Sequence, residues 1–228
     1  LLRKSDILFG IMGEFWWNEW DKSIYADWKP KMVRLDMAVD INSYPFIKLH
    51  FNIAGERKFL FIGNNNPNKN TAMLTHLAEK LEPESIGWIG SGNEIPGVKR
   101  ISSDVALTPD FMKEIARRYD FFISTSLADA NPTTILESMA WGFPVVCTPQ
   151  SGYSETEYLF NIDAKDIDKS ISILNHLQFA PANYLIEVSL AARKVVKNTY
   201  NWDNFTDKLI HHLGVSKLRN ATQFKIST

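Results

Sequence analysis

The stretch from Asp120 to Glu155 constrains the fold of this chain more than any other, because it predicts three consecutive elements. Phe121 to Thr125 is a short apolar and β-branched run, which is typical of a buried strand. Phe143 to Thr148 is a second such run, and the residues between the two have helical periodicity. Two strands joined by a helix usually pair in parallel, so this stretch predicts part of a parallel sheet.

The helix between these strands carries a signal at each end. Asn131 can cap it, and Pro132 suits its first position. Gly142 is placed to end it just after Trp141. At about 100° per residue, one face of the helix is apolar and is predicted to face the core, through Ile135, Leu136, Met139 and Ala140.

Glu137 falls on the opposite face of this predicted helix, together with Thr133, Thr134 and Trp141. Two interpretations are open. The carboxylate is either a solvated surface group without a function, or an acceptor for a cis-diol beside N-terminal amides that bind phosphate. Periodicity alone does not choose between them.

Composition excludes several classes of protein. The chain has 228 residues, of which 45% are hydrophobic, as expected for an ordinary soluble core. Its net charge of −1 implies no general attraction to nucleic acid or to an anionic membrane. The single cysteine, Cys147, excludes an internal disulfide and a cysteine zinc site, and its place at a strand end favours a small buried hydrophobe.

Location and metal binding can also be addressed from the sequence. No apolar run is long enough to span a bilayer and no signal peptide is evident, so we expect a cytoplasmic protein, with peripheral membrane contact left open. The histidines are scattered, and Asp166 and Asp168 open a predicted helix, where acidic residues favour the helix dipole. We therefore expect neither a metal nor a cofactor. The chain starts at Leu1 without an initiator methionine, and we expect it to be a fragment.

The first residues read as the end of a separate unit. Ile7 to Met12 predicts a strand, Glu14 to Trp28 a helix rich in aromatic residues, and Lys31 to Asp40 an extended segment. The aromatic residues could dock on a membrane interface or fill a seam with a neighbouring domain. We favour the seam because the helix is not basic. Ile47 to Ile53 is an apolar run that could form an extra strand.

Six predicted strands alternate with helices in the rest of the chain, which indicates a doubly wound, parallel, Rossmann-like sheet. The strands are Lys58–Ile62, Ile86–Ile89, Val98–Ser102, Phe121–Thr125, Phe143–Thr148 and Glu157–Phe160. With the order 3-2-1-4-5-6, the loops Gly63–Lys69 and Ser126–Pro132 lie together where the strand order reverses. Ligands bind such sheets at that point.

The stretch around the helix resembles the signature of retaining GT-B glycosyltransferases, in the family often called glycosyl transferase group one. Asp129 and Glu137 have the family's acidic-x7-Glu spacing. They are followed by Ser-Met-Ala-Trp-Gly-Phe-Pro-Val-Val and by a Gly-x-x-Glu pattern at Gly152 and Glu155. The combination is far more specific than a lone pair of carboxylates.

Weaker resemblances and departures accompany this signature. The family's Gly-Arg-x-x-x-x-Lys loop is matched by Gly63 and Lys69, but Asn64 replaces the arginine, and the loop alone reads as an Asn-rich surface turn. Ala130 replaces a glycine that many relatives carry. The crossover into the second domain is matched at Val39-Asp40 and Tyr44-Pro45. This implies residues 1–40 as the end of an N-terminal domain and crossover linker, 41–215 as a nucleotide-sugar-binding domain and 216–228 as a tail.

The resemblance implies a site for a nucleoside-diphosphate sugar, used without metal and with retention. Lys69 and the amides of Thr133 and Thr134 would hold the diphosphate near Gly63 and Asn64. Glu137 would hold the ribose hydroxyls and Asp129 the donor sugar. The loop with Asp104 and Val105 would pack against the nucleobase.

The resemblance leaves the acceptor open as a glycan, a lipid-linked sugar or a small molecule. Its site would lie in the missing N-terminal domain, so this chain would supply only the donor half. The alternative is a non-catalytic nucleotide-sugar-binding or interaction module that has lost its arginine. A GT-B-like epimerase is disfavoured because no acid/base histidine is evident.

Overall fold

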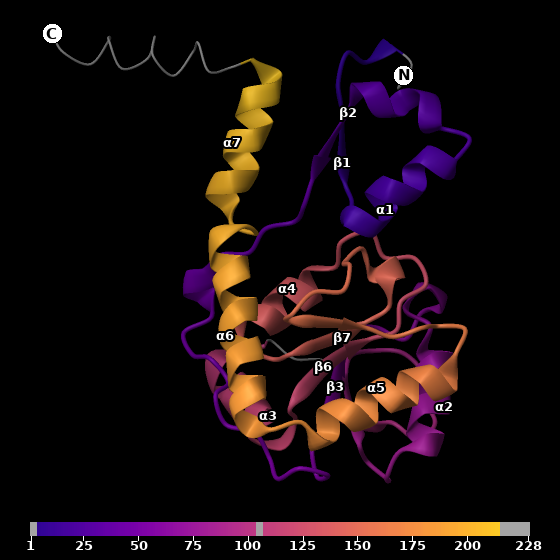
Figure 1. The fold of residues 1–228 in the computed structure, drawn as a ribbon, viewed down its shortest axis with the longest axis vertical. Helices are drawn as coiled ribbons and strands as arrows, with labels where there is room; N and C mark the ends of the chain where they lie inside the picture. Colours follow the sequence, from indigo (N-terminus) through magenta and orange to yellow (C-terminus); the bar gives the residue numbers. More distant parts are fainter. Residues whose placement is uncertain (1–3, 104–106, 215–228) are drawn as a thin grey trace, which may run out of the picture.

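A parallel six-stranded sheet forms the centre of the chain in the computed structural model, which describes residues 4–103 and 107–214 (Figure 1). The strand order is β5-β4-β3-β6-β7-β8, which confirms the predicted order with its reversal between β3 and β6. All neighbouring pairs are parallel. The strands are β3 (Phe59–Ile62), β4 (Ile86–Ile89), β5 (Lys99–Ser102), β6 (Phe121–Ser124), β7 (Val145–Cys147) and β8 (Leu159–Asn161).

Helices cover both faces of this sheet because its strands are apolar on both faces. Successive side chains of a strand point to opposite faces. Phe59 and Phe61 of β3 therefore pack with α2 (Thr71–Lys80) and α5 (Ile167–Phe179). Leu60 packs on the other side with α3 (Pro109–Arg118), α4 (Thr133–Ala140) and α6 (Ala182–Asn198). The result is the expected three-layer α/β architecture.

A small second sheet lies apart from the main one (Figure 1). It pairs β1 (Leu8–Ile11) with β2 (Met32–Leu35) in parallel, with Leu8 opposite Met32. We call this part, residues 4–35, the small lobe, and the rest the large lobe. The last helix, α7 (Trp202–Leu213), follows α6 and contacts β2, so the chain returns to the small lobe at its end.

Two predicted elements in the first 60 residues are wrong. The helix from Glu14 to Trp28 is divided into α1 (Glu14–Glu19) and the 3-10 turns η2 (Trp20–Lys22) and η3 (Ala26–Lys31). The break falls at Ser23, whose hydroxyl donates to Trp20 O and accepts from Tyr25 N–H, so local side-chain bonds replace the helical ladder.

The apolar run from Ile47 to Ile53 forms no strand. Its backbone bonds go elsewhere: Lys48 N–H donates to Trp141 O at 2.8 Å, and Asn52 N–H donates to the Asp120 carboxylate at 2.9 Å. Buried Asp120 also lies 3.2 Å from Lys48 Nζ, so one carboxylate fixes this segment across the large lobe.

The backbones of the two lobes meet so closely at Gly13 and Gly152 that neither position has room for a side chain. Gly13 N–H donates to Ala130 O at 2.7 Å, and a Cβ on Gly13 would overlap the Gly152 carbonyl. Gly152 has φ +90°, and a Cβ there would overlap the Ala130 oxygen. Trp16 of the small lobe adds a second hydrogen bond between the lobes, because its indole N–H donates to Gln150 O at 2.9 Å. For Trp16, the seam interpretation of the aromatic segment is therefore correct.

We predict that Gly152→Ala destabilises the chain by roughly 2–5 kcal/mol. A left-handed alanine costs about 1–2 kcal/mol, and the overlap with Ala130 adds the cost of overpacking, about 1–3 kcal/mol. Gly214→Ala is the matched control, because Gly214 also has positive φ (+66°) but has nothing within 4 Å of a Cβ. Urea unfolding measures both variants. Equal losses would mean that close packing at Gly152 is unimportant.

Candidate functional site

The loop after β3 is fixed to the end of β4 by its backbone. Gly63 N–H donates to Ile89 O at 2.9 Å, and Asn65 N–H donates to Ser91 O at 2.8 Å. The loop then forms the 3-10 turn η5 (Pro67–Lys69), which Asn66 caps by accepting from Lys69 N–H at 3.2 Å. The asparagines therefore set the path of the loop and end it at Lys69.

Lys69 meets the second candidate loop directly. Its Nζ lies 2.5 Å from Asp129 Oδ2, with the two side chains 19% and 23% exposed. The loops are also joined through their backbones, because Leu127 N–H donates to Asn68 O at 2.9 Å. Thr125 Oγ1 donates to the carbonyls of Lys69 and Asn70 at 3.0 and 3.1 Å. The two loops that the strand order was expected to bring together are thus in contact.

The amino end of α4 follows Asp129 closely in the sequence, because the helix begins at Thr133. Thr133 and Thr134 form the first turn of the helix, where backbone N–H groups have no acceptor within the helix. Asn131 does not cap α4, which corrects the prediction: its Oδ1 accepts from Met37 N–H in the crossover from the small lobe, and Pro132 takes the cap position. The first-turn amides are therefore left without a side-chain cap.

Glu137 lies one turn further along α4 and is half-buried. Burial raises the pKa of its carboxyl above the usual range, and a hydrogen bond from Thr133 lowers the pKa in part. Its charge also contributes, after burial, to raising the pKa of Tyr44. Glu137 is therefore a half-buried carboxylate, and its role as a cis-diol acceptor stays a prediction.

Trp141, four residues further along the chain, is buried on the same face. The sequence placed it on the face away from the core, but it is only 2% exposed. Tyr44 and Phe46 of the crossover pack on it, with ring centroids 4.9 and 4.6 Å away. The crossover segment therefore covers the face of α4 that helical periodicity assigned to solvent.

Sequence reasoning missed Arg193, which holds this arrangement together. From α6 its guanidinium donates to the Ala140 carbonyl at the end of α4, to Tyr44 O at 2.8 Å and to Phe46 O at 3.4 Å. Burial lowers its pKa. No motif marks this residue, because its acceptors are backbone carbonyls that only the fold brings together.

A cavity of about 500 Å³ opens at the carboxyl ends of β3, β4 and β5. Asn64, which replaces the expected arginine, lines it and uses its side-chain oxygen to accept from Ser91 N–H and Oγ–H at 3.3 and 2.9 Å. The other lining residues are Ile62, Gly63, Ile89, Gly90, Ser91, Ser103 and Leu107. Asp104 and Val105, the candidates for the nucleobase, lie outside the described residues.

Other predictions concern metal ligands, the start of α5, Cys147 and membrane-spanning helices. In residues 4–103 and 107–214, no cluster of three or more His, Cys, Asp or Glu residues could hold a metal ion. Asp166 caps α5 by accepting from Lys169 N–H at 2.9 Å, which confirms the helix-start interpretation. Cys147 is buried, and burial raises its pKa. None of the described helices is long and apolar enough to cross a bilayer.

We predict that Glu137→Gln leaves the free energy of unfolding at pH 7 equal or higher. Because burial raises the pKa of Glu137, its charge costs stability at neutral pH, and this cost disappears as the pH falls below the ordinary value of about 4.3. Any gain should therefore shrink toward pH 4. Glu187→Gln, on the exposed surface of α6, is the matched control. If Glu137→Gln loses more than about 0.5 kcal/mol at pH 7, the carboxylate is a structural hydrogen-bond partner.

Comparison with known proteins identifies the family and the fold of this chain. The family model described as glycosyl transferases group 1 matches residues 56–176. Sucrose synthase of Denitrovibrio acetiphilus is 30% identical over 112 residues, which cover 46% of this chain and 14% of that protein.

Two solved structures share the fold over nearly the whole chain. HepE of Anabaena, solved with UDP and glucose, has a TM-score of 0.69 at 13% identity, over 93% of this chain and 64% of its own. Sucrose-phosphate synthase of Thermosynechococcus elongatus has a TM-score of 0.68 at 12% identity, over 96% of this chain and 60% of its own. The chain thus spans less than two thirds of each of these relatives.

Proposed function

The chain belongs to the group 1 glycosyl transferases, and we propose that it supplies the donor-binding half of an enzyme that transfers a sugar from a nucleoside diphosphate. The observation that carries this proposal is the contact of Lys69 with Asp129 across the strand-order reversal. Lys69 also lies close to Gly63, which lines the cavity, and the uncapped amino end of α4 follows Asp129 four residues later in the sequence.

The leaving group in such a transfer is a diphosphate, so the main requirement is stabilisation of negative charge. Lys69 would donate to the diphosphate, and the amides of Thr133 and Thr134 would add hydrogen bonds at the helix terminus. These groups act without a metal ion in the proposed mechanism. Transfer with retention at the sugar carbon is the outcome that the resemblance implies.

Nucleotide binding would extend from the phosphates in two directions. Glu137 would accept hydrogen bonds from the ribose hydroxyls, and the base would enter the cavity beside Gly63 and Asn64. The structures of HepE hold UDP and UDP-glucose, which supports a uridine nucleotide as the first ligand to test.

Asp129 would hold the donor sugar once the diphosphate has taken its place on Lys69. In the structure the two side chains neutralise each other, so donor binding requires an exchange of Asp129 for phosphate as the partner of Lys69. The carboxylate released by this exchange can then face the sugar and steady positive charge on its ring.

The acceptor would bind between the donor domain and an N-terminal domain of which the small lobe is the end. Its class stays open as a glycan, a lipid-linked sugar or a small molecule. We place this step in the complete protein, since the chain spans only 14% of sucrose synthase and 64% of HepE.

One observation favours a second function, that of a non-catalytic nucleotide-sugar-binding module. Asn64 stands where the family has an arginine, and its side-chain oxygen is already bonded to Ser91. The loop thus offers the diphosphate one cation, Lys69, where relatives have two. Transfer of a radiolabelled sugar by the complete protein separates the two functions, because the module would bind the donor without turnover.

We predict that Lys69→Ala weakens binding of UDP at least ten-fold but changes binding of uridine less than two-fold. A hydrogen bond to a charged group contributes about 1.5–3 kcal/mol, and only the diphosphate would receive it. Calorimetry measures both ligands, with Lys80→Ala as the control, since Lys80 pairs with Asp168 on the exposed surface. If Lys69→Ala weakened the binding of UDP and of uridine equally, Lys69 would have a structural role.

We predict that Asp129→Asn tightens binding of UDP by up to about five-fold. The substitution removes the anion that competes for Lys69, and partly exposed pairs of this kind contribute up to about 1 kcal/mol. Asp168→Asn, which releases Lys80 in the same way, is the matched control and should leave UDP binding unchanged. Weaker binding by the Asp129 variant would contradict the proposed exchange of partners.

A further inference from the structure

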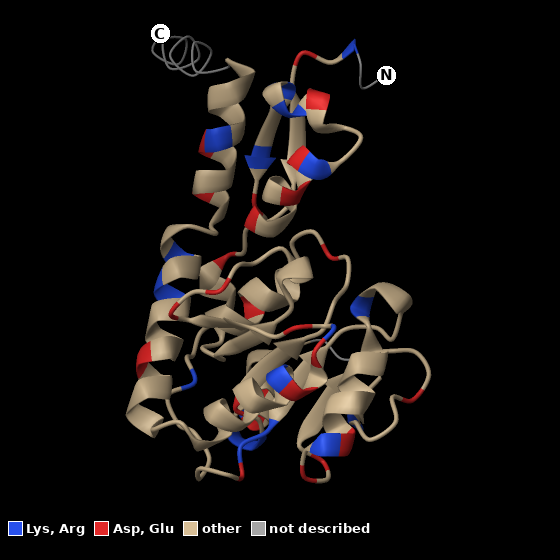
Figure 2. Ribbon diagram, turned by 45° about the vertical axis from the view of Figure 1, so that its right-hand side comes forward, with Lys and Arg blue, Asp and Glu red and all other residues tan. Residues whose placement is uncertain are grey.

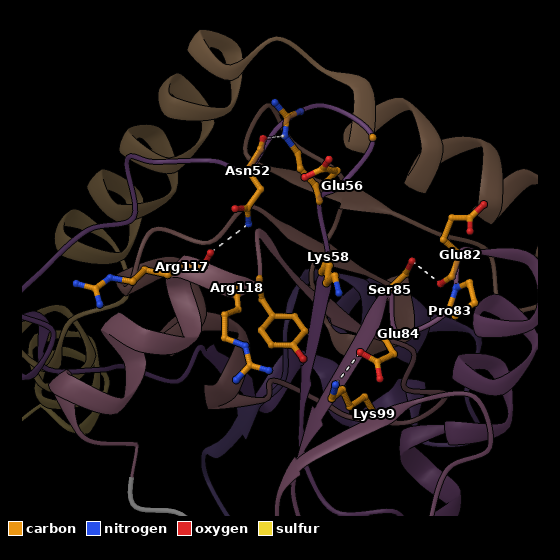
Figure 3. Close-up of a pocket in the computed structure, with 13 residues that line it drawn as sticks. Asn52, Glu56, Lys58, Glu82, Pro83, Glu84, Ser85, Lys99, Arg117 and Arg118 are labelled. Carbon is orange, nitrogen blue, oxygen red and sulfur yellow. Dashed lines mark hydrogen bonds and ion pairs between the residues drawn. The ribbon is translucent and has the colours of Figure 1, made fainter.

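A second cavity, of about 540 Å³, lies at the amino ends of the strands, opposite the edge that carries the proposed donor site (Figure 3). Lys58 directly precedes β3, Ser85 directly precedes β4, and Lys99 opens β5. The end of α3 closes one side through Arg118 and Tyr119. None of these residues belongs to the proposed donor site.

The cations that face this cavity are only partly paired. Lys99 Nζ lies 2.6 Å from Glu84 Oε2, and Figure 3 shows this pair beside the Lys58 side chain. Within the part of the chain that the structure describes, Lys58 Nζ and the Arg118 guanidinium have neither an ion pair nor a hydrogen bond; Arg118 only stands over the Tyr119 ring, 6.0 Å from its centroid. Two positive charges are therefore available to a ligand.

The local field is positive although the chain as a whole is not. Figure 2 shows acidic and basic residues interspersed along the chain, which has a net charge of −1. The pKa of the Glu84 carboxyl at this cavity is lowered, mainly by the hydrogen bond and charge of Lys99. The charges of Lys58 and Arg118 contribute less. The three cations are thus close enough to Glu84 to favour its charged form.

Tyr119 adds a neutral donor to the wall. Gly87 in β4 leaves the space that its phenol ring occupies, because a Cβ at that position would overlap the ring and the hydroxyl. Tyr119 is only 2% exposed, yet it lines the cavity, and no described residue forms a hydrogen bond with its hydroxyl. The wall therefore offers an O–H group whose ring is held in place against β4.

We propose that this cavity binds a phosphomonoester of about the size of a sugar phosphate. Lys58, Arg118 and the Tyr119 hydroxyl would hold the phosphate, because two cations and a neutral donor suit a dianion. Glu82 and Glu56 also line the cavity and would accept hydrogen bonds from ligand hydroxyl groups. The site is separate from the donor site and does not depend on the proposed transfer reaction.

Calorimetry with glucose 6-phosphate, inorganic phosphate and glucose at low ionic strength tests the proposal. We expect glucose 6-phosphate to bind, inorganic phosphate to bind more weakly, and glucose not to bind at millimolar concentration. Lys58→Gln combined with Arg118→Gln should weaken binding at least ten-fold. Lys69→Ala should change it less than two-fold, because the donor site is at the other edge of the sheet. Absence of glucose 6-phosphate binding to the native chain would overturn the proposal.

Arg117→Gln is the matched control for charge. Arg117 is adjacent in sequence, equally cationic and at the edge of the same cavity, but Figure 3 shows its side chain directed away from Lys58 and Arg118. We expect less than a two-fold effect, and a loss equal to that of the double variant would reduce the site to general charge attraction. Amide chemical shifts of the native chain test the location without any substitution. Shifts at Lys58, Ser85 and Tyr119 are expected, and shifts confined to residues 63–69 would overturn the proposal.

Discussion

The pairing of β3 with β6 is the constraint on which the candidate site depends. These strands are adjacent in the sheet although two strands and two helices separate them in sequence, so the loops that follow them begin side by side. The contact of Lys69 with Asp129 and the bond from Leu127 to Asn68 are direct consequences. Any ligand held at this edge is therefore held by two distant segments at once, which is the general behaviour of doubly wound sheets at their reversal point.

The position of α4 is fixed from three sides, and this decides the environment of Glu137. Arg193 holds the carboxyl end of the helix, and Trp141 packs against Tyr44 and Phe46 of the crossover. At the amino end, Ala130 meets Gly13 and Gly152 so closely that no Cβ fits there. The crossover and the lobe contact together leave the first-turn amides of α4 uncapped and the carboxylate half-buried. Burial raises the pKa of this carboxyl, and the hydrogen bond from Thr133 opposes the shift in part.

Local patterns predicted the large lobe well because its elements are short and strongly marked. Apolar runs located the six strands, and Gly142, with φ +81°, ends α4 as its position suggested. The errors arose where tertiary contacts override local preference. Ser23 interrupts an aromatic helix, Asn131 bonds to the crossover instead of capping α4, and Trp141 is buried by a segment about 100 residues earlier in the chain. For the site, the motif spacing identified Lys69, Asp129 and Glu137 as candidates, but it carried no information on Arg193, whose partners are carbonyls from two separate segments.

The central claim is that Lys69 exchanges Asp129 for the diphosphate of a nucleotide donor at the edge between β3 and β6. A crystal structure of this chain with UDP measures this directly. The account predicts phosphate oxygens within hydrogen-bond distance of Lys69 Nζ and of the Thr133 or Thr134 amide, the ribose hydroxyls on Glu137, and Asp129 released from the 2.5 Å contact that it makes in the free chain. UDP bound away from these groups, or bound with the contact between Lys69 and Asp129 unchanged, would contradict it.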